Sequence, residues 1–185
     1  MKNILLIIIF CSFSGLFAQE KVGLKEIYVE NDLAYKVSND QLFSGQAQKV
    51  RRNEHLVYEE YYENGIPIKS ILYYNGTEKP KPVELIEFYD KTFDKKKVTR
   101  YGLSKPTIEY KYYAQNGNKT LIEEYENDKL TYRCEYQNGK KHGTEFCFDD
   151  DGKELEIEYR NGKKITQKKL QKMNHPFVSY LKVKK

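Results

Sequence analysis

The chain has 185 residues, a length that suits one domain or one continuous array of repeats. A mean hydropathy of -0.81 argues against a compact globule with a thick core. The formal charge is +5, and the aromatic residues include 17 tyrosines and no tryptophan. Because tyrosine combines a large apolar ring with a polar hydroxyl, it suits half-buried positions. This composition predicts an elongated β structure with a shallow core.

The N-terminus predicts export. Lys2 precedes an apolar stretch from Ile4 to Ala18 that is shorter than the roughly 20 residues needed to span a bilayer as a helix. We interpret residues 1–18 as a signal peptide cleaved after Ala18, which would place the mature protein in the periplasm or outside the cell. An uncleaved anchor is the alternative. A lipoprotein at Cys11 is disfavoured, because Phe10 stands where a small residue is expected.

Turn sequences then recur along the chain. A lead-in over residues 19–41, with one or two strands, precedes them. The turns follow about every 11 residues in both halves, which is the length of one strand plus one turn. Asn-Gly and Asp-Gly accept the positive φ angles of tight hairpin turns. The dipeptides that carry this signal are Asn64-Gly65, Asn75-Gly76, Asn116-Gly117, Asn127-Asp128, Asn138-Gly139, Asp151-Gly152 and Asn161-Gly162.

Apolar and polar residues alternate between these turns. Leu155, Ile157 and Tyr159 alternate with glutamates, and the same period of two recurs in other segments. This pattern predicts an antiparallel sheet with one solvated face. Residues 77–107 depart from the rhythm, as either a degenerate repeat or an inserted loop. We expect the other face to hold a thin core of Tyr62, Tyr110, Tyr112, Tyr132, Tyr136 and Tyr159.

The C-terminal residues 165–185 predict a short lysine-rich cap. Ile165–Met173 suits a short helix ending before Pro176, and Phe177–Val183 suits a final strand. No acidic residue occurs between Lys163 and Lys185. This basic end is either a solvated terminus or a contact for anionic envelope surfaces.

The segment Tyr136–Lys164 resembles the MORN-variant repeats of exported bacterial proteins. It carries a Tyr-x-Asn-Gly-Lys opening, the aromatic pair Phe146 and Phe148, and a closing Asp-Gly-Lys. Residues Leu42–Gly76 look like an N-terminal copy, so the resemblance spans residues 42–164 and departs from the repeat pattern at 77–107. It implies a ribbon of successive β-hairpins with a scaffold or interaction role. Some members are catalogued as antitoxins, a role that export would separate from a cytosolic toxin. The expected turn glycines are Gly45, Gly65, Gly76, Gly117, Gly139, Gly143, Gly152 and Gly162.

No catalytic or metal site is expected from the sequence. It has no phosphate-binding glycine loop, no nucleophile elbow, and no defensible Ser/His/Asp arrangement. The carboxylates alternate along strands instead of converging. The histidines are not at zinc-ligand spacing from one another or from cysteine, so we expect no cofactor. These histidines are His55, His142 and His175.

Cys134 and Cys147 lie nearly opposite each other about the turn at Gly139–Gly143. Matching the aromatic faces of the two strands would put the thiols on opposite sides of the sheet, where a disulfide cannot form. Two free thiols are therefore expected, although a β-bulge would allow a disulfide.

The expected function is a protein-protein interaction module or scaffold in the cell envelope. The alternatives are a glycan- or envelope-surface-binding protein, and a structural spacer. Nucleic acid is not an expected partner of an exported protein. Tyrosines in the opposite phase to the expected core are the candidate contact residues: Tyr61, Tyr73 and Tyr113.

Overall fold

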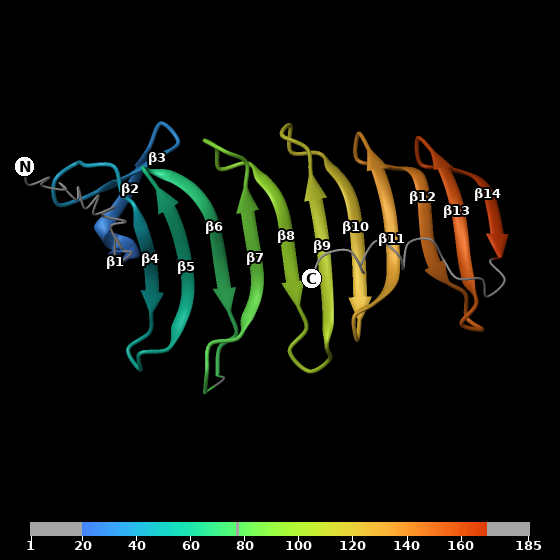
Figure 1. Ribbon diagram of the computed structural model, residues 1–185, viewed down its shortest axis with the longest axis horizontal. Helices are drawn as coiled ribbons and strands as arrows, with labels where there is room; N and C mark the ends of the chain where they lie inside the picture. Colours follow the sequence, from blue (N-terminus) through green and yellow to red (C-terminus); the bar gives the residue numbers. More distant parts are fainter. Residues whose placement is uncertain (1–19, 77, 170–185) are drawn as a thin grey trace, which may run out of the picture.

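A computed structural model of the chain describes residues 20–76 and 78–169. These residues form one 12-stranded sheet and a separate two-stranded sheet (Figure 1). The described part contains no α-helix, so none that could span a membrane. The large sheet contains β1 (Glu20–Gly23), β4 (Gly45–Val50), β5 (Leu56–Glu63), β6 (Ile66–Tyr73), β7 (Pro82–Phe88), β8 (Lys95–Tyr101), β9 (Thr107–Tyr113), β10 (Lys119–Glu126), β11 (Lys129–Gln137), β12 (Lys140–Phe148), β13 (Glu154–Arg160) and β14 (Lys163–Lys169).

From β4 onward each strand pairs antiparallel with the next, so the sheet is a simple meander. Its turns follow the sequence. Asn64 and Gly65 have φ angles of 50° and 77°, as a two-residue hairpin turn requires. Asn127-Asp128 adopts the same geometry without glycine, with φ angles of 50° and 61°. The prediction of an all-β chain built on one long, open antiparallel sheet is confirmed.

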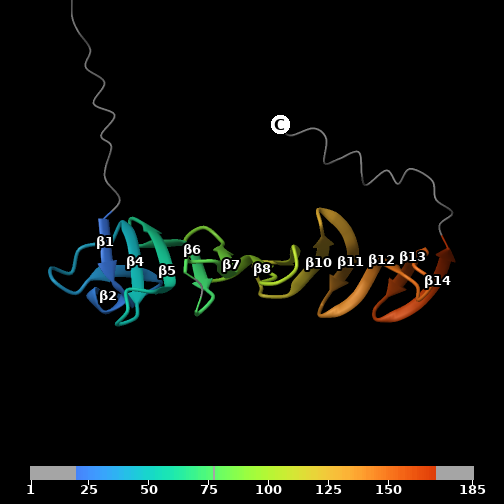
Figure 2. The ribbon, with the colours of Figure 1, turned by 90° about the horizontal axis from the view of Figure 1, so that it is seen from below.

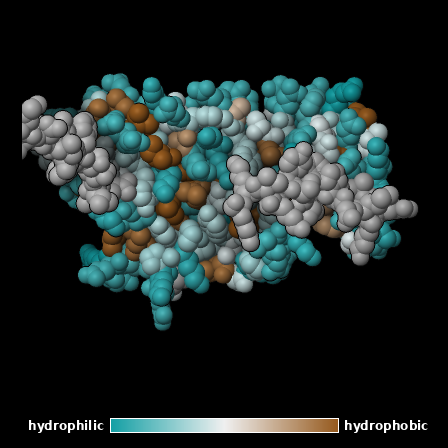
Figure 3. Space-filling view, in the orientation of Figure 1, coloured by the Kyte–Doolittle hydropathy of each residue, from teal (hydrophilic) through white to brown (hydrophobic). Residues whose placement is uncertain are grey.

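Most of the sheet is a single layer. Seen from below, its strands follow one undulating line (Figure 2). Among residues 20–76 and 78–169, a second layer is present only at the N-terminal end. There the hairpin of β2 (Ile27–Glu30) and β3 (Leu33–Lys36) contributes to a small apolar cluster, with the one-turn 3-10 helix η1 (Leu24–Glu26) beside it. The buried members of this cluster are Ala34, Phe43, Ala47 and Tyr62. Hydrophilic side chains separate small apolar patches in the view of Figure 3.

Strand β1 pairs in parallel with β4, unlike the rest of the sheet. The β2–β3 hairpin occupies the connection between them and turns at Asn31-Asp32, where both φ angles are positive. The lead-in therefore contains three strands, where one or two were expected.

Of the two alternatives for residues 77–107, the structure favours continuation of the array over an inserted loop, because β7 and β8 continue the meander. One expectation about the array needs correction. The expected helix beginning at Ile165 is wrong over its first residues, which belong to strand β14. The tight turn at Asn161-Gly162 pairs this segment with β13, and that pairing overrides local helix propensity. The signal peptide, the expected strand Phe177–Val183 and the rest of the cap lie outside the described residues.

The two faces of the sheet follow from the register. One row of paired residues runs from Glu59 through Thr99 to Tyr110 and on to Arg133, and we call its side the Tyr110 face. The neighbouring row runs from Glu60 through Val98 to Cys134 and Glu145. Its side chains point to the opposite side of the sheet, which we call the Cys134 face.

The expectation of one core face is therefore wrong. Tyr110 and Tyr112 lie on one face, whereas Tyr132 lies on the other. Buried residues also occur on both, for example Thr99 on the Tyr110 face and Ile157 on the Cys134 face. In a single layer, neighbouring side chains on each face bury one another.

Candidate interaction surface on the Tyr110 face

Four tyrosines from three adjacent strands gather on the Tyr110 face. They are Tyr101 of β8, Tyr110 and Tyr112 of β9, and Tyr125 of β10, and with Lys97 of β8 we call them the tyrosine patch. The ring centroids of Tyr110 and Tyr125 are 5.7 Å apart, and those of Tyr110 and Tyr112 are 6.4 Å apart. Lys97 Nζ lies 4.2 Å from the Tyr110 ring centroid. The aromatic and cationic contacts hold the rings in fixed positions.

The patch keeps polar groups available. All four tyrosines are half-buried. The Tyr112 hydroxyl donates to Glu123 Oε2 at 3.3 Å, and partial burial together with Glu123 raises the pKa of Tyr112. Within the described residues, the hydroxyls of Tyr110 and Tyr125 have no hydrogen-bond partner. Fixed aromatic rings with free hydroxyls are typical of contact residues in protein interfaces.

Two of the expected contact residues have a different role. Tyr61 and Tyr73 lie on the Tyr110 face, where both hydroxyls donate to Glu59 Oε2, at 3.0 and 2.6 Å. Gln48 Nε2 donates to Glu59 Oε1 at 2.7 Å, and Gln46 Nε2 donates to the same oxygen. Glu59 is only 4% exposed. We call these five residues the Glu59 cluster.

The donors of the Glu59 cluster are all neutral. Lys69 contacts the cluster through an aromatic ring, with Nζ 4.3 Å from the Tyr61 ring centroid. Burial, and then the hydrogen bond to Glu59, raises the pKa of Tyr61 to about 12. The two tyrosine hydroxyls therefore solvate a buried carboxylate and are not free for a ligand.

The third expected contact residue lies elsewhere. Tyr113 pairs with Lys119, on the Cys134 face. Its carbonyl accepts a hydrogen bond from the Tyr89 hydroxyl at 2.6 Å. Tyr61, Tyr73 and Tyr113 thus do not form one surface, and the sequence analysis missed the tyrosine patch because only the strand register brings its members together.

A second buried carboxylate lies on the Cys134 face. Glu145 is 5% exposed, accepts a hydrogen bond from the Tyr132 hydroxyl at 2.8 Å, and forms an ion pair with Lys141. Lys141 Nζ also lies 5.1 Å from the Tyr159 ring centroid. Burial opposes ionisation, but the hydrogen bonds from Lys141 and Tyr132 outweigh it and lower the pKa of Glu145. These four residues are the Glu145 cluster.

Cys134 and Cys147 are both free thiols, the first buried and the second half-buried. The expectation that they lie on opposite faces is wrong. Glu145 pairs with Cys134, and Cys147 lies two residues further along β12 on the same face. The reason is that the aromatic residues of β11 and β12 do not share a face: Phe146 pairs with Arg133, on the side opposite Cys134. The resulting diagonal offset of roughly 7–8 Å exceeds the usual span of a disulfide.

All eight expected turn glycines have positive φ angles, but two do not lie in turns. Gly45 begins β4, and Gly143 lies inside β12 at the register shift. A Cβ atom at Gly143 would overlap the Glu135 carboxylate, which accepts a hydrogen bond from the Thr144 amide at 3.0 Å. Gly143 therefore permits a bulge that brings a carboxylate against the backbone.

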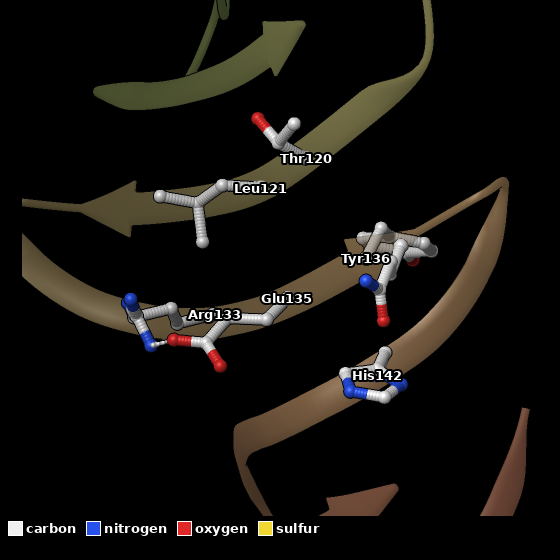
Figure 4. A pocket seen from close by; sticks show the side chains of 7 residues that line it. Thr120, Leu121, Arg133, Glu135, Tyr136 and His142 are labelled. Atoms are coloured by element: carbon white, nitrogen blue, oxygen red, sulfur yellow. Dashed lines mark ion pairs between the residues drawn. The ribbon is translucent and has the colours of Figure 1, made fainter. Parts of the chain in front are cut away.

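An open hollow on the sheet adjoins this bulge (Figure 4). Arg133 and Glu135 form an ion pair of 2.9 Å in it, and His142 lies near Tyr136. The hollow shows no nucleophile held by a base. In the part of the chain that the structure describes, no group of three His, Cys, Asp or Glu residues is placed to hold a metal ion.

Comparison of the chain with protein-family models, with curated proteins and with solved structures gives no match. The resemblance to MORN-variant repeats therefore remains a prediction from the residues that carry it.

Proposed function

We propose that this protein is a non-catalytic, exported interaction module that binds a partner protein through the tyrosine patch. The observation that carries the proposal is the pair Tyr110 and Tyr125, whose rings are packed together and whose hydroxyls have no partner among the described residues. A partner can bury these rings and pair these hydroxyls without disturbing any hydrogen bond within the sheet.

The sheet supports this role by its rigidity. The patch lies on three adjacent strands, and each strand pairs with neighbours on both sides. The side chains are therefore ordered before binding, which lowers the entropic cost of association. On the opposite face, Arg100 of β8 forms ion pairs with Glu84 of β7 and Glu109 of β9, so the two faces differ in chemistry.

Export is part of the proposal and rests on the sequence of residues 1–18. A glycan ligand is the second candidate, because tyrosine rings exposed on a sheet can also stack on sugars. A structural spacer would use neither the rings nor their hydroxyls.

The test is affinity capture from solubilised cell envelope, followed by binding of the recovered protein after purification. Changing Tyr110 and Tyr125 to Ser should abolish capture and weaken direct binding about 1,000-fold, since aromatic contact residues contribute about 2 kcal/mol each. Tyr113→Ser is the matched control, because it changes the same strand on the opposite face. Capture that survives the double substitution, or binding only to purified cell-wall glycan, would contradict the proposal.

A further inference from the structure

Strand β14 is the last strand of the sheet, and only one of its edges is paired. It pairs with β13 from Lys163↔Arg160 to Lys169↔Leu155. No other strand among the described residues pairs with its outer edge. All seven side chains of β14 are exposed. The backbone groups on such an edge offer a template for another extended chain.

The charged residues of β14 are all basic. Its sequence contains Lys163, Lys164, Lys168 and Lys169 and no acidic residue. Lys169 forms an ion pair with Asp149 at 3.1 Å. Lys163 and Lys168 have no ion-pair partner within residues 20–76 and 78–169. Between the lysines, Ile165 is 50% exposed and offers an apolar contact.

A second copy of the chain does not suit this edge. Antiparallel self-pairing centred on Thr166 would place Lys163 opposite Lys169 and Lys164 opposite Lys168. Like charges directly opposite each other in a sheet are destabilising. An acidic strand would replace each of these repulsions with an attraction.

We infer that the outer edge of β14 binds an extended acidic segment of a partner protein, which pairs with it as an additional strand. Backbone hydrogen bonds would supply the affinity and the lysines the selectivity for acidic residues. This site is separate from the tyrosine patch, because three strands lie between β10 and β14. The two proposals can therefore fail independently.

The experiment is fluorescence anisotropy of the purified protein with short labelled peptides. The probe is a peptide of alternating Glu and Val, and its controls are a Lys-Val peptide and a Glu-Val peptide in which every amide is N-methylated. We expect the first peptide alone to bind. Changing Lys163 and Lys168 to Glu should weaken its binding about tenfold, because two exposed attractions become repulsions.

The matched variant carries Lys95→Glu and Lys96→Glu, which change exposed lysines in the internal strand β8. Binding should be unchanged in it, and circular dichroism should show that both variants fold. The inference is overturned if the Glu-Val peptide does not bind at low salt, or if the N-methylated peptide binds equally well. It is also overturned if hydrogen exchange shows the outer-edge amides of β14 already protected in the free protein, since the edge would then be occupied.

Discussion

The Glu59 and Glu145 clusters each stabilise a buried carboxylate, but with different kinds of donor. Each holds a carboxylate that is 5% exposed or less on a sheet with a single layer over most of its length. Glu59, near the N-terminal end, is stabilised by two amides and two phenols, all neutral. Glu145, near the C-terminal end and on the other face, is stabilised chiefly by the ammonium group of Lys141, together with the Tyr132 hydroxyl.

The difference shows how a sheet without a thick core can be held together. Long tyrosine and lysine side chains lie along its faces, cover their neighbours and direct polar tips to buried carboxylates. In the Glu59 cluster the stabilisation is divided among four donors, whereas in the Glu145 cluster much of it depends on one cation. Substitutions should therefore affect the two ends of the sheet unequally.

The largest effect is expected at Lys141. Lys141→Met keeps the length of the side chain but leaves the Glu145 carboxylate buried without its cation. Because Lys141 is one-third exposed, we expect a loss of about 2 kcal/mol in the free energy of unfolding, below the full cost of breaking a buried ion pair. Urea unfolding measures it. The control is Lys140→Met, an exposed neighbour; equal losses in both variants would show that the ion pair is not the cause.

A smaller effect is expected in the Glu59 cluster. Tyr61→Phe and Tyr73→Phe each remove one of four donors to Glu59, and each should cost about 1 kcal/mol of unfolding free energy. Tyr110→Phe removes a hydroxyl without a partner in the described residues, so its cost should be near zero. If all three substitutions have the same effect in urea unfolding, the distinction between structural and available hydroxyls is wrong.

The response to pH should also separate the clusters. The pKa of Tyr61 is raised from 10.0 to about 12, so its contribution to stability is complete below pH 10 and is lost as the pH rises toward 12. The pKa of Glu145 is lowered from 4.5, so its contribution is complete above pH 4.5 and is lost as the pH falls below it.

Urea midpoints measured across the pH range test this. Tyr61→Phe should reduce the loss of stability at alkaline pH, and Glu145→Gln should reduce the loss at acidic pH. A Tyr61→Phe variant with an unchanged alkaline transition would contradict the role given to that phenol.

Strands and turns were the predictable part of the molecule. Asn-Gly dipeptides and alternating residues identify hairpins because both effects are local. The hairpin at Asn31-Asp32 was missed, although it uses the same turn chemistry as Asn127-Asp128. The strands in the irregular stretch around Lys95 were harder to predict, because this stretch lacks the turn dipeptides that mark the neighbouring hairpins.

The faces and the candidate surface were not predictable, because they depend on register. The pairing of Phe146 with Arg133 puts Cys134 and Cys147 on one face, against the aromatic pattern of the sequence. In the sequence of β5, Glu59 looks like an ordinary solvent-exposed glutamate. Its burial becomes evident only from the contacts of Gln46 and Tyr73, which come from the adjacent strands. The tyrosine patch likewise requires knowledge of which strands are neighbours.

The most direct test of the account compares binding and stability in two variants of the same protein. One carries Tyr110→Ser with Tyr125→Ser, and the other carries Tyr61→Phe. The measurement is partner retention on an affinity column, with the urea midpoint of each variant determined alongside. The account predicts that the first variant loses the partner and that the second retains it with a lower midpoint. Loss of the partner from the Tyr61→Phe variant alone would contradict the assignment of the tyrosine patch as the binding surface.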